Sequence, residues 1–217
     1  MVPLRVLVAC ECSGRVRDAF RALGHDAMSC DIQPTEAEGP HYQGDVRDVL
    51  SDNWDLMIAH PPCTYLSRAG ARWWKVPGRQ EKAEAAAEFV QLLWNAPIGR
   101  IAIENPIGKL NSMWRYPDQT IQPWWFGDPW TKATCLWLKG LPLLIPTNPV
   151  SNPKPLLPSN TGAGRRDGQK WAKGAVSNAK DASRTFPGIA AAFAIQWGSV
   201  PVIQTPEPVS QTELSFP

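Results

Sequence analysis

The chain has 217 residues, of which 43% are hydrophobic and 19% charged, which excludes global disorder and predicts one domain with its own core. Its 22 Lys and Arg against 20 Asp and Glu leave a net charge of +2, which neither requires nor excludes a polyanionic partner. No apolar run approaches the ~20 residues of a membrane span, and the N-terminus resembles a strand rather than a signal peptide, so we expect a cytoplasmic protein without membrane contact.

Strand and helix patterns alternate over the first half of the chain. The strand patterns cover residues 4–9, 27–30, 54–59 and 100–103, and the helical patterns cover 16–23 and 81–94. This alternation predicts an α/β fold with a doubly wound, mostly parallel sheet. Ligands of such sheets bind beyond the carboxyl ends of the strands. We therefore expect the turn at Cys10, the acids Asp31 and Asp45, and the segments 60–63 and 104–106 to line one cleft.

The second half is less regular. Residues 132–138 resemble a strand, and 187–197 resemble a final apolar helix. Pro, Asn, Gly and Lys without periodicity indicate a long loop at 145–182, and the Pro- and Ser-rich end indicates a disordered tail. The predicted division is a core (1–144), a basic Pro- and Gly-rich loop (145–182), a helix returning to the core (183–200) and the tail (201–217).

The five cysteines show no metal-binding pattern. Cys10 and Cys12 are separated by one residue, whereas a zinc knuckle needs at least two, and the three histidines are scattered. We therefore expect no metal site. An odd number of cysteines in a cytosolic chain indicates free thiols.

A cysteine and a glutamate follow two of the predicted strands. Cys63 is preceded by two prolines, which aim its thiol rigidly, and Glu104 comes about forty residues later. The pair suits thiolate attack on C6 of a cytosine ring while a carboxyl group engages N3, after which C5 can take a methyl group from a sulfonium donor. The alternative is that Cys63 is a buried strand-end cysteine and the two prolines belong to a loop.

The order of short motifs resembles the C5-cytosine DNA methyltransferase family across most of residues 4–140. Residues 8–14 (Val-Ala-Cys-Glu-Cys-Ser-Gly) stand where the family has a glycine-rich turn, of which only Gly14 remains. Asp31 matches the acid that holds the cofactor's ribose, and residues 44–46 (Gly-Asp-Val) match the element whose aspartate binds adenine. The resemblance implies S-adenosylmethionine as cofactor. The residues expected to bind it are Cys10, Glu11, Ser13, Gly14, Asp31, Ile32, Asp45, Val46 and Pro61.

The motifs that carry the chemistry follow in the family's order. Residues 60–63 (His-Pro-Pro-Cys) match the nucleophile loop Gly-Pro-Pro-Cys, and 104–106 (Glu-Asn-Pro) match Glu-Asn-Val. Residues 126–134 resemble Tyr-Gly-Val-Pro-Gln-x-Arg-x-Arg, with Lys132 and Thr134 in place of the arginines, and Thr134 is too short to replace an arginine fork. The residues expected to contact the substrate are Pro62, Arg72, Asn105, Lys132, Arg165 and Arg166.

The resemblance implies a Rossmann-like methyltransferase fold of the kind that a bacteriophage carries. The implied activity is methyl transfer from S-adenosylmethionine to C5 of cytosine in DNA, through a covalent Cys63 adduct that Glu104 assists. To donate a proton at ring N3, Glu104 should lie in an enclosed, apolar setting that raises its pKa.

Family members usually insert a target-recognition domain where this chain has only the loop before its last helix. The cations of that loop are Lys154, Arg165, Arg166, Lys170, Lys173 and Lys180. A basic loop with one tryptophan suits phosphate contact with little base readout, so we expect loose specificity, or a protein partner that supplies specificity. The resemblance implies duplex DNA with a flipped base as the substrate, while single-stranded DNA and RNA stay open. A solvated surface loop is the alternative.

Two other functions remain open. An amino-methyltransferase acting on adenine N6 or cytosine N4 would have Asp, Asn or Ser at position 60 and an aromatic residue at 63, where this chain has His60 and Cys63. A degenerate methyltransferase fold that binds nucleic acid or cofactor without turnover is favoured by the reduced glycine turn. The presence of both Cys63 and Glu104 argues against it.

Overall fold

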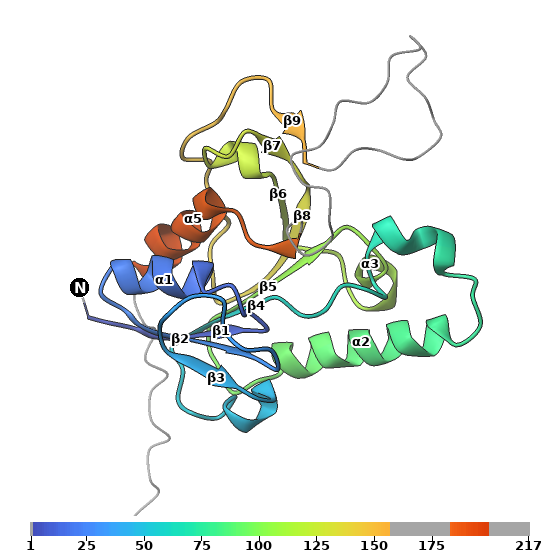
Figure 1. Ribbon diagram of the computed structural model, residues 1–217, viewed down its shortest axis with the longest axis horizontal. Coiled ribbons are helices and arrows are strands. Elements are labelled where there is room, and N and C mark those ends of the chain that lie inside the picture. The colour runs from blue at the N-terminus through green and yellow to red at the C-terminus, as the bar shows by residue number, and fades with distance from the viewer. Residues whose placement is uncertain (1, 157–182, 200–217) are drawn as a thin grey trace, which may run out of the picture.

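The computed structural model describes residues 2–156 and 183–199, and its centre is a seven-stranded sheet with the order β3-β2-β1-β4-β5-β8-β6 (Figure 1). The strands of this sheet are β1 (Arg5–Ala9), β2 (Asp26–Asp31), β3 (His41–Gln43), β4 (Leu56–Ala59), β5 (Ile101–Pro106), β6 (Gln119–Ile121) and β8 (Thr134–Lys139). The first five are parallel, whereas β8 is antiparallel to both β5 and β6. A small parallel pair joins β7 (Trp130–Thr131) to β9 (Lys154–Pro155).

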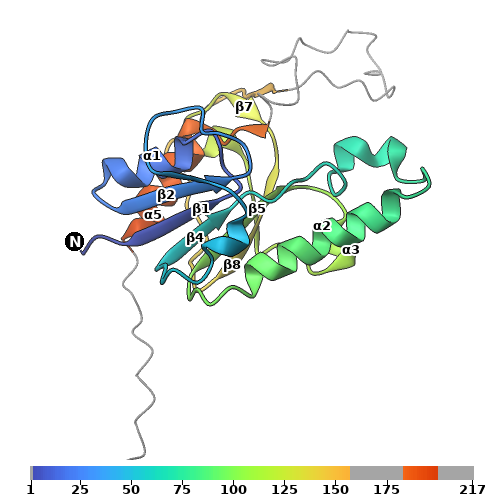
Figure 2. The same cartoon turned by 60° about the horizontal axis from the view of Figure 1, so that its bottom comes forward.

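Helices cover both faces of the sheet, so the fold is the predicted doubly wound, Rossmann-like α/β fold (Figures 1 and 2). One face is covered by α1 (Arg15–Ala22) and α5 (Pro187–Gly198), and the other by α2 (Arg79–Trp94) and α3 (Leu110–Met113). Short 3-10 helices are η1 (Val46–Asp48), η2 (Arg68–Trp73) and η3 (Pro123–Trp125).

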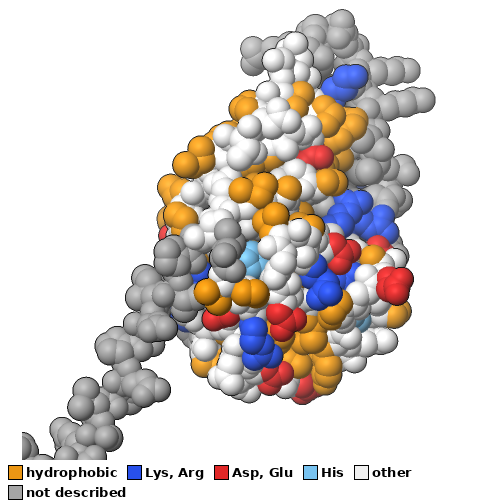
Figure 3. All heavy atoms as spheres, turned by 90° about the vertical axis from the view of Figure 1, so that its left-hand side faces the viewer, with side chains coloured by type: hydrophobic (Ala, Val, Ile, Leu, Met, Phe, Trp, Pro, Cys, Tyr) orange, Lys and Arg blue, Asp and Glu red, His pale blue; other side chains and the backbone are white. Residues whose placement is uncertain are grey.

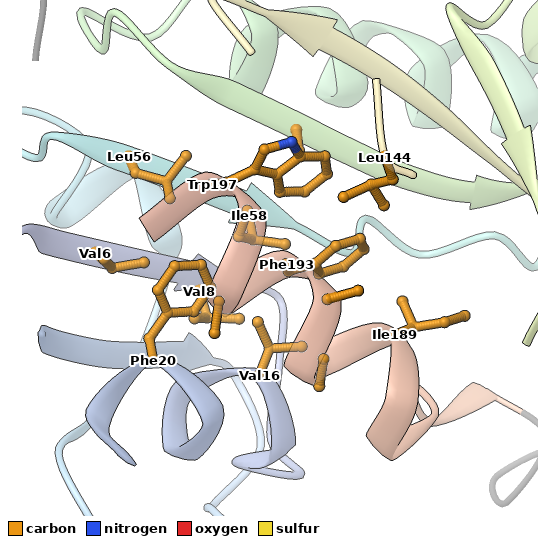
Figure 4. Packing of buried hydrophobic residues seen from close by; sticks show 14 of the residues in the cluster. Val6, Val8, Val16, Phe20, Leu56, Ile58, Leu144, Ile189, Phe193 and Trp197 are labelled. Atoms are coloured by element: carbon orange, nitrogen blue, oxygen red, sulfur yellow. The ribbon is translucent and has the colours of Figure 1, made fainter. Parts of the chain in front are cut away.

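The core has two halves because each central strand is buried on both faces. Along β1, Val6 and Val8 pack with α1 and α5, whereas Leu7 and Ala9 pack with α2. This explains why the central strands read as continuous apolar runs rather than alternating patterns. Figure 4 shows Val6 and Val8 facing the aromatic side chains of α1 and α5. The rings of Phe193 and Trp197 stack there, with centroids 4.6 Å apart.

The predicted strands and helices of the first half are confirmed, with shifted ends. Helix α2 begins at Arg79, two residues before the predicted start, because Gly78 adopts φ 75° and lets the chain turn into the helix. Strand β5 continues to Pro106, past the predicted end at 103, because it pairs with β8 through Glu104 and Asn105. Pairing with a neighbouring strand therefore extends β5 over polar residues that carry no strand pattern.

The predicted loop at 145–182 lies only partly within the described residues. Its first part packs on the core, since the backbone of Ile145 exchanges two 2.9 Å hydrogen bonds with the amide of Gln196, and Leu156 is buried. Residues 157–182, including Arg165 and Arg166, and the predicted tail lie outside the described residues. Within the described ranges, no helix has the length and apolar character needed to cross a membrane.

Candidate active site

The carboxyl ends of four parallel strands meet at the edge of the sheet where the strand order reverses between β1 and β4. Doubly wound sheets bind their ligands at such a switch point. Cys10 follows β1, Asp31 ends β2, His60 follows β4 and Glu104 lies near the end of β5. The structure therefore places these sequence-predicted turns at one edge of the sheet.

A pocket of about 230 Å³ lies at this edge. Of the predicted cofactor residues, those that line it are Cys10, Asp31, Ile32, Asp45 and Val46. Pro62, predicted to contact the substrate, also lines it. So do His60 and Phe89, neither of which was assigned to a cofactor from the sequence. Phe89 belongs to α2, far from the motifs, and no sequence signal distinguishes it from a core residue.

Two carboxylates face the pocket and differ in their hydrogen-bond partners. Asp31 accepts the backbone N–H of Gln33 at Oδ1 (2.9 Å), while its Oδ2 has no hydrogen-bond partner within the described chain. Asp45 caps η1 by accepting the N–H of Arg47 (2.9 Å) and also pairs with the Arg47 guanidinium (2.7 Å). That ion pair is exposed and therefore contributes little, so Asp45 can exchange it for a ligand donor.

The remaining predicted cofactor residues lie outside the pocket lining; they are Glu11, Ser13, Gly14 and Pro61. Glu11 is 5% exposed, and its carboxylate accepts the N–H groups of Val16 (2.9 Å) and Arg17 (3.3 Å) and the hydroxyl of Ser13 (2.9 Å). Gly14 adopts φ 75°, and a Cβ there would lie 2.5 Å from the Arg17 guanidinium. These residues build the start of α1, and their contact with a cofactor stays a prediction.

The turn that carries Cys63 is fastened to its own chain and to β5. The carbonyl of Cys63 accepts the N–H groups of Leu66 (3.0 Å) and Ser67 (2.8 Å). Asn105 is 1% exposed, and its Nδ2 donates to the carbonyl of Pro61 (2.9 Å). The structure therefore gives Asn105, predicted to contact the substrate, a position from which it orients the turn that carries Cys63.

Glu104 is hydrogen-bonded on both carboxylate oxygens. Nδ1 of His60 lies 3.2 Å from Oε2, and the hydroxyl of Thr134 donates to Oε1. Burial alone would raise the pKa of Glu104, but the His60 hydrogen bond, the charge of Lys132 and the Thr134 hydrogen bond lower that pKa to about 2. The expected raised pKa is therefore wrong. The setting is enclosed but polar, and its donors stabilise the carboxylate.

Thr134 has a role that the sequence did not reveal. It is buried at the start of β8, opposite Pro106 of β5, and this antiparallel register brings its hydroxyl to Glu104. A short side chain suffices there because the two strands are direct neighbours. The sequence comparison, in which Thr134 stands in place of an arginine, gave no indication of this hydrogen bond.

Cys63 and Lys132 complete the candidate active site. Burial raises the pKa of the Cys63 thiol, and the Glu104 carboxylate raises it further, whereas Lys132 and a backbone hydrogen bond lower it. The thiol is therefore protonated near neutral pH, and Lys132 is the side chain that favours the thiolate. Lys132 is half-buried, and its Nζ lies 5.8 Å from the centre of the Phe186 ring.

The segment after Cys63, together with Lys109, forms a basic strap, which we define as residues 64–82 and Lys109. Its cations are Arg68, Arg72, Lys75, Arg79, Lys82 and Lys109, and none forms an ion pair within residues 2–156 and 183–199. Arg72 lies over the half-exposed ring of Trp73 (5.0 Å), and Lys109 lies over Trp74 (5.2 Å). The part of the strap that precedes α2 projects from the sheet beside that helix (Figure 2).

The opposite side of the molecule has mixed charge. On this side, basic and acidic side chains lie among hydrophobic ones (Figure 3). Arg5 and Asp26, for example, lie 3.9 Å apart. In the described part of the chain, no group of three or more His, Cys, Asp or Glu could hold a metal ion, and none of the five cysteines forms a disulfide.

No protein-family model and no curated protein sequence matches the chain. Among solved structures, it is similar to a methyltransferase of Entamoeba histolytica, with 15% sequence identity and a TM-score of 0.45. The match covers 69% of this chain and 58% of the other, so this chain spans less than two thirds of that protein's length. The fold assignment itself rests on the strand order and on the helices that cover both faces of the sheet.

Proposed function

We propose that the chain transfers a methyl group from S-adenosylmethionine to C5 of cytosine in DNA. The observation that carries the proposal is the convergence of Cys63, Glu104 and Lys132 beside a pocket at the switch point of the sheet. A thiol nucleophile, a carboxyl group and a cation around one cleft support covalent addition to an electron-poor ring.

The pocket residues fit this cofactor. The free Oδ2 of Asp31 can accept the ribose hydroxyls, and Asp45 can accept the adenine amino group. Ile32, Val46 and Phe89 supply apolar contacts for a planar base. When bound, S-adenosylmethionine supplies an electrophilic methyl group.

The side chains divide the reaction between them. Cys63 gives its proton to solvent, with Lys132 stabilising the thiolate, and the sulfur adds to C6 of the ring, so that electron density moves towards C5 and N3. Glu104 takes up a proton when the base enters and shares it with N3 as the basicity of N3 rises, which stabilises the transition state more than the ground state. C5 then takes the methyl group, with the demethylated donor as the leaving group. Solvent removes the C5 proton, the Cys63–C6 bond breaks, and the aromatic ring is restored.

The basic strap supports a nucleic acid as acceptor. Its six cations lack acidic partners within the described chain, and Trp73 is 49% exposed, so the strap offers charge and a stacking surface to one ligand. Lys and Arg release counterions when they bind phosphates, and aromatic rings can stack on bases. The strap follows Cys63 directly in sequence, so a bound strand would pass the nucleophile.

A second candidate function is binding without turnover. The observation that favours it is the resting protonation of the reacting groups, since Cys63 is held as a thiol and Glu104 as a carboxylate. The proposed reaction needs the opposite state in each. Base binding would have to shift both groups.

The test is incubation with tritiated S-adenosylmethionine and duplex DNA, followed by nucleoside analysis. We expect label in 5-methylcytosine, and a covalent complex with 5-fluorocytosine DNA that survives denaturing electrophoresis. Cys63→Ala should abolish the complex, whereas the control Cys12→Ala should retain it. Equal trapping by Cys63→Ala would refute the nucleophile. Cofactor and DNA binding without any transfer would establish the second candidate.

A further inference from the structure

His60 lies between the pocket and the carboxylate of Glu104. It directly follows β4, and its backbone N–H donates to the carbonyl of Ala9 at the end of β1 (2.9 Å), which fixes its backbone at the switch point. Nδ1 of the ring lies 3.2 Å from Oε2 of Glu104, and the same side chain lines the pocket. The side chain is 12% exposed, so its surroundings are almost entirely protein.

The second ring nitrogen has no partner in the protein. Nε2 of His60 is buried and has no hydrogen bond within residues 2–156 and 183–199. Buried polar atoms in native proteins are nearly always paired with protein, water or ligand. The contact with the Glu104 carboxylate selects the tautomer whose hydrogen lies on Nδ1, and in that neutral tautomer Nε2 is an acceptor.

Three side chains of the pocket lining carry acceptors. They are the carboxylates of Asp31 and Asp45 and Nε2 of this His60 tautomer, so this part of the pocket suits a ligand with N–H and O–H donors. Asp31 and Asp45 flank the carboxyl end of β2, whereas His60 lies on the far side of β1. A ligand that reaches His60 therefore extends across the switch point towards Glu104.

We propose that His60 is a positioning residue that links cofactor binding to Glu104. Its Nε2 accepts a hydrogen bond from a donor group of bound S-adenosylmethionine, while its Nδ1–H holds the Glu104 carboxylate. The inference rests on the proposed function. Glycine, which stands at this position in the family that the sequence resembles, has no side chain to form such a link. Cofactor binding and the orientation of Glu104 then affect each other reciprocally.

Calorimetric titration with S-adenosylmethionine tests the link through a double-mutant cycle. We expect His60→Ala to weaken binding about tenfold, as loss of one buried hydrogen bond does. His60→Gln should bind within about threefold of the unmodified protein, because its amide can both donate and accept. Glu104→Ala should weaken binding in the unmodified protein and have no further effect in His60→Ala. The exposed control Asp52→Ala should bind normally.

Nitrogen NMR of protein with labelled histidines gives an independent readout. The chain has three histidines, so the signals of His60 are those missing from His60→Gln. We expect the signal of its unprotonated nitrogen to move upfield when S-adenosylmethionine saturates the protein. An unmoved signal at saturation, normal affinity of His60→Ala, or additive effects in the cycle would each overturn the inference.

The two proposals fail in different ways. If 5-methylcytosine forms and His60→Ala does not change the affinity for S-adenosylmethionine, the link is wrong and the proposed function stands. If S-adenosylmethionine does not bind the unmodified protein and DNA is not labelled, both are wrong. The link through His60 is supported only if the double-mutant cycle is non-additive and the His60 signal also shifts.

Discussion

Glu104 and Cys63 have pKa values displaced in opposite directions by their surroundings. The carboxylate is stabilised by His60, Lys132 and Thr134, and its negative charge adds to the burial that keeps Cys63 protonated. A flipped base entering between them would replace these interactions. The protonation states at rest are therefore set by the protein's own side chains and need not be those of the reacting complex.

Replacement of Glu104 by Gln tests its proton transfer. The amide oxygen can still accept from His60, and the Thr134 hydroxyl can accept from the amide, so cofactor affinity should be retained. The amide cannot exchange a proton with N3, so turnover should fall by roughly 10²–10⁴. Steady-state methylation beside calorimetry measures both quantities. Near-normal turnover would leave Glu104 a structural residue.

The pocket acids give a second prediction at this scale. Asp31→Ala and Asp45→Ala each remove a charged acceptor, which typically costs about 1.5–3 kcal/mol, or roughly 10- to 150-fold in affinity. Calorimetry with S-adenosylmethionine measures the loss, with Asp52→Ala as an exposed acidic control. Unchanged binding by both variants would place the cofactor elsewhere.

At the scale of elements, helix α1 depends on a residue outside its own cap position. Its N-cap is Gly14, which has no side chain, so the carboxylate of Glu11 satisfies the N–H groups of Val16 and Arg17 instead. The negative charge also complements the positive end of the helix dipole. The turn at the switch point and the start of α1 are thereby one structural unit.

Glu11→Ala should therefore destabilise the fold by about 1–2 kcal/mol, the usual cost of losing a helix cap. Urea denaturation measures this change. Glu11→Gln, which keeps an acceptor, should recover part of it. Calorimetry on the same variants decides the predicted cofactor role of Glu11: a cap alone leaves affinity for S-adenosylmethionine nearly unchanged, whereas a direct interaction with the cofactor lowers it.

A prediction at this scale concerns the basic strap. Replacing Arg68, Arg72 and Lys75 together by Ala should weaken binding to DNA. It should also reduce the slope of the logarithm of the binding constant against the logarithm of the salt concentration, by about 0.9 for each phosphate that is no longer neutralised. Arg21→Ala on α1, an exposed arginine away from the strap, is the matched control. Fluorescence anisotropy at several salt concentrations measures the slope, and an unchanged slope would remove the strap from the interface.

At the scale of the whole molecule, His25 connects the two ends of the described fold. It is 4% exposed, its Nδ1 accepts the N–H of Leu4 (3.2 Å), and a Cβ on Gly198 would lie 2.5 Å from its Nε2. Burial, and then the charge of Arg100, lower the pKa of His25 from its ordinary value of 6.5. The folded protein therefore favours the neutral ring.

Stability should consequently fall as the pH drops below about 6.5, because the unfolded chain takes up a proton that folded His25 resists. His25→Gln should show a flatter profile between pH 8 and 5, measured as the urea midpoint. That range lies above the ordinary pKa of Glu104 at 4.5, so the contribution of its depressed pKa, lost only as the pH falls from there towards 2, does not interfere. Parallel profiles for the two proteins would contradict the role of His25.

Local sequence determined the central strands and helices α1 and α2. The apolar runs of β1 and β4 and the helical spacing in α1 and α2 are local signals that need no partner to be recognised. The order of these elements was sufficient to predict the doubly wound sheet, and with it the edge where Asp31, Asp45 and Cys63 lie. Strand β3, with its polar residues 41–43, has no such signal and was missed.

Tertiary structure alone decided the electrostatics of the site. The low pKa of Glu104 depends on His60, which directly follows β4, and on Thr134, which reaches it through the antiparallel register of β5 and β8. Neither interaction has a local signature, because it depends on which strands become neighbours. Glu11 shows the same limit, since its acceptor role follows from the path of the turn into α1. Residue types can be read along the chain, whereas pKa values follow from distances between segments that only folding brings together.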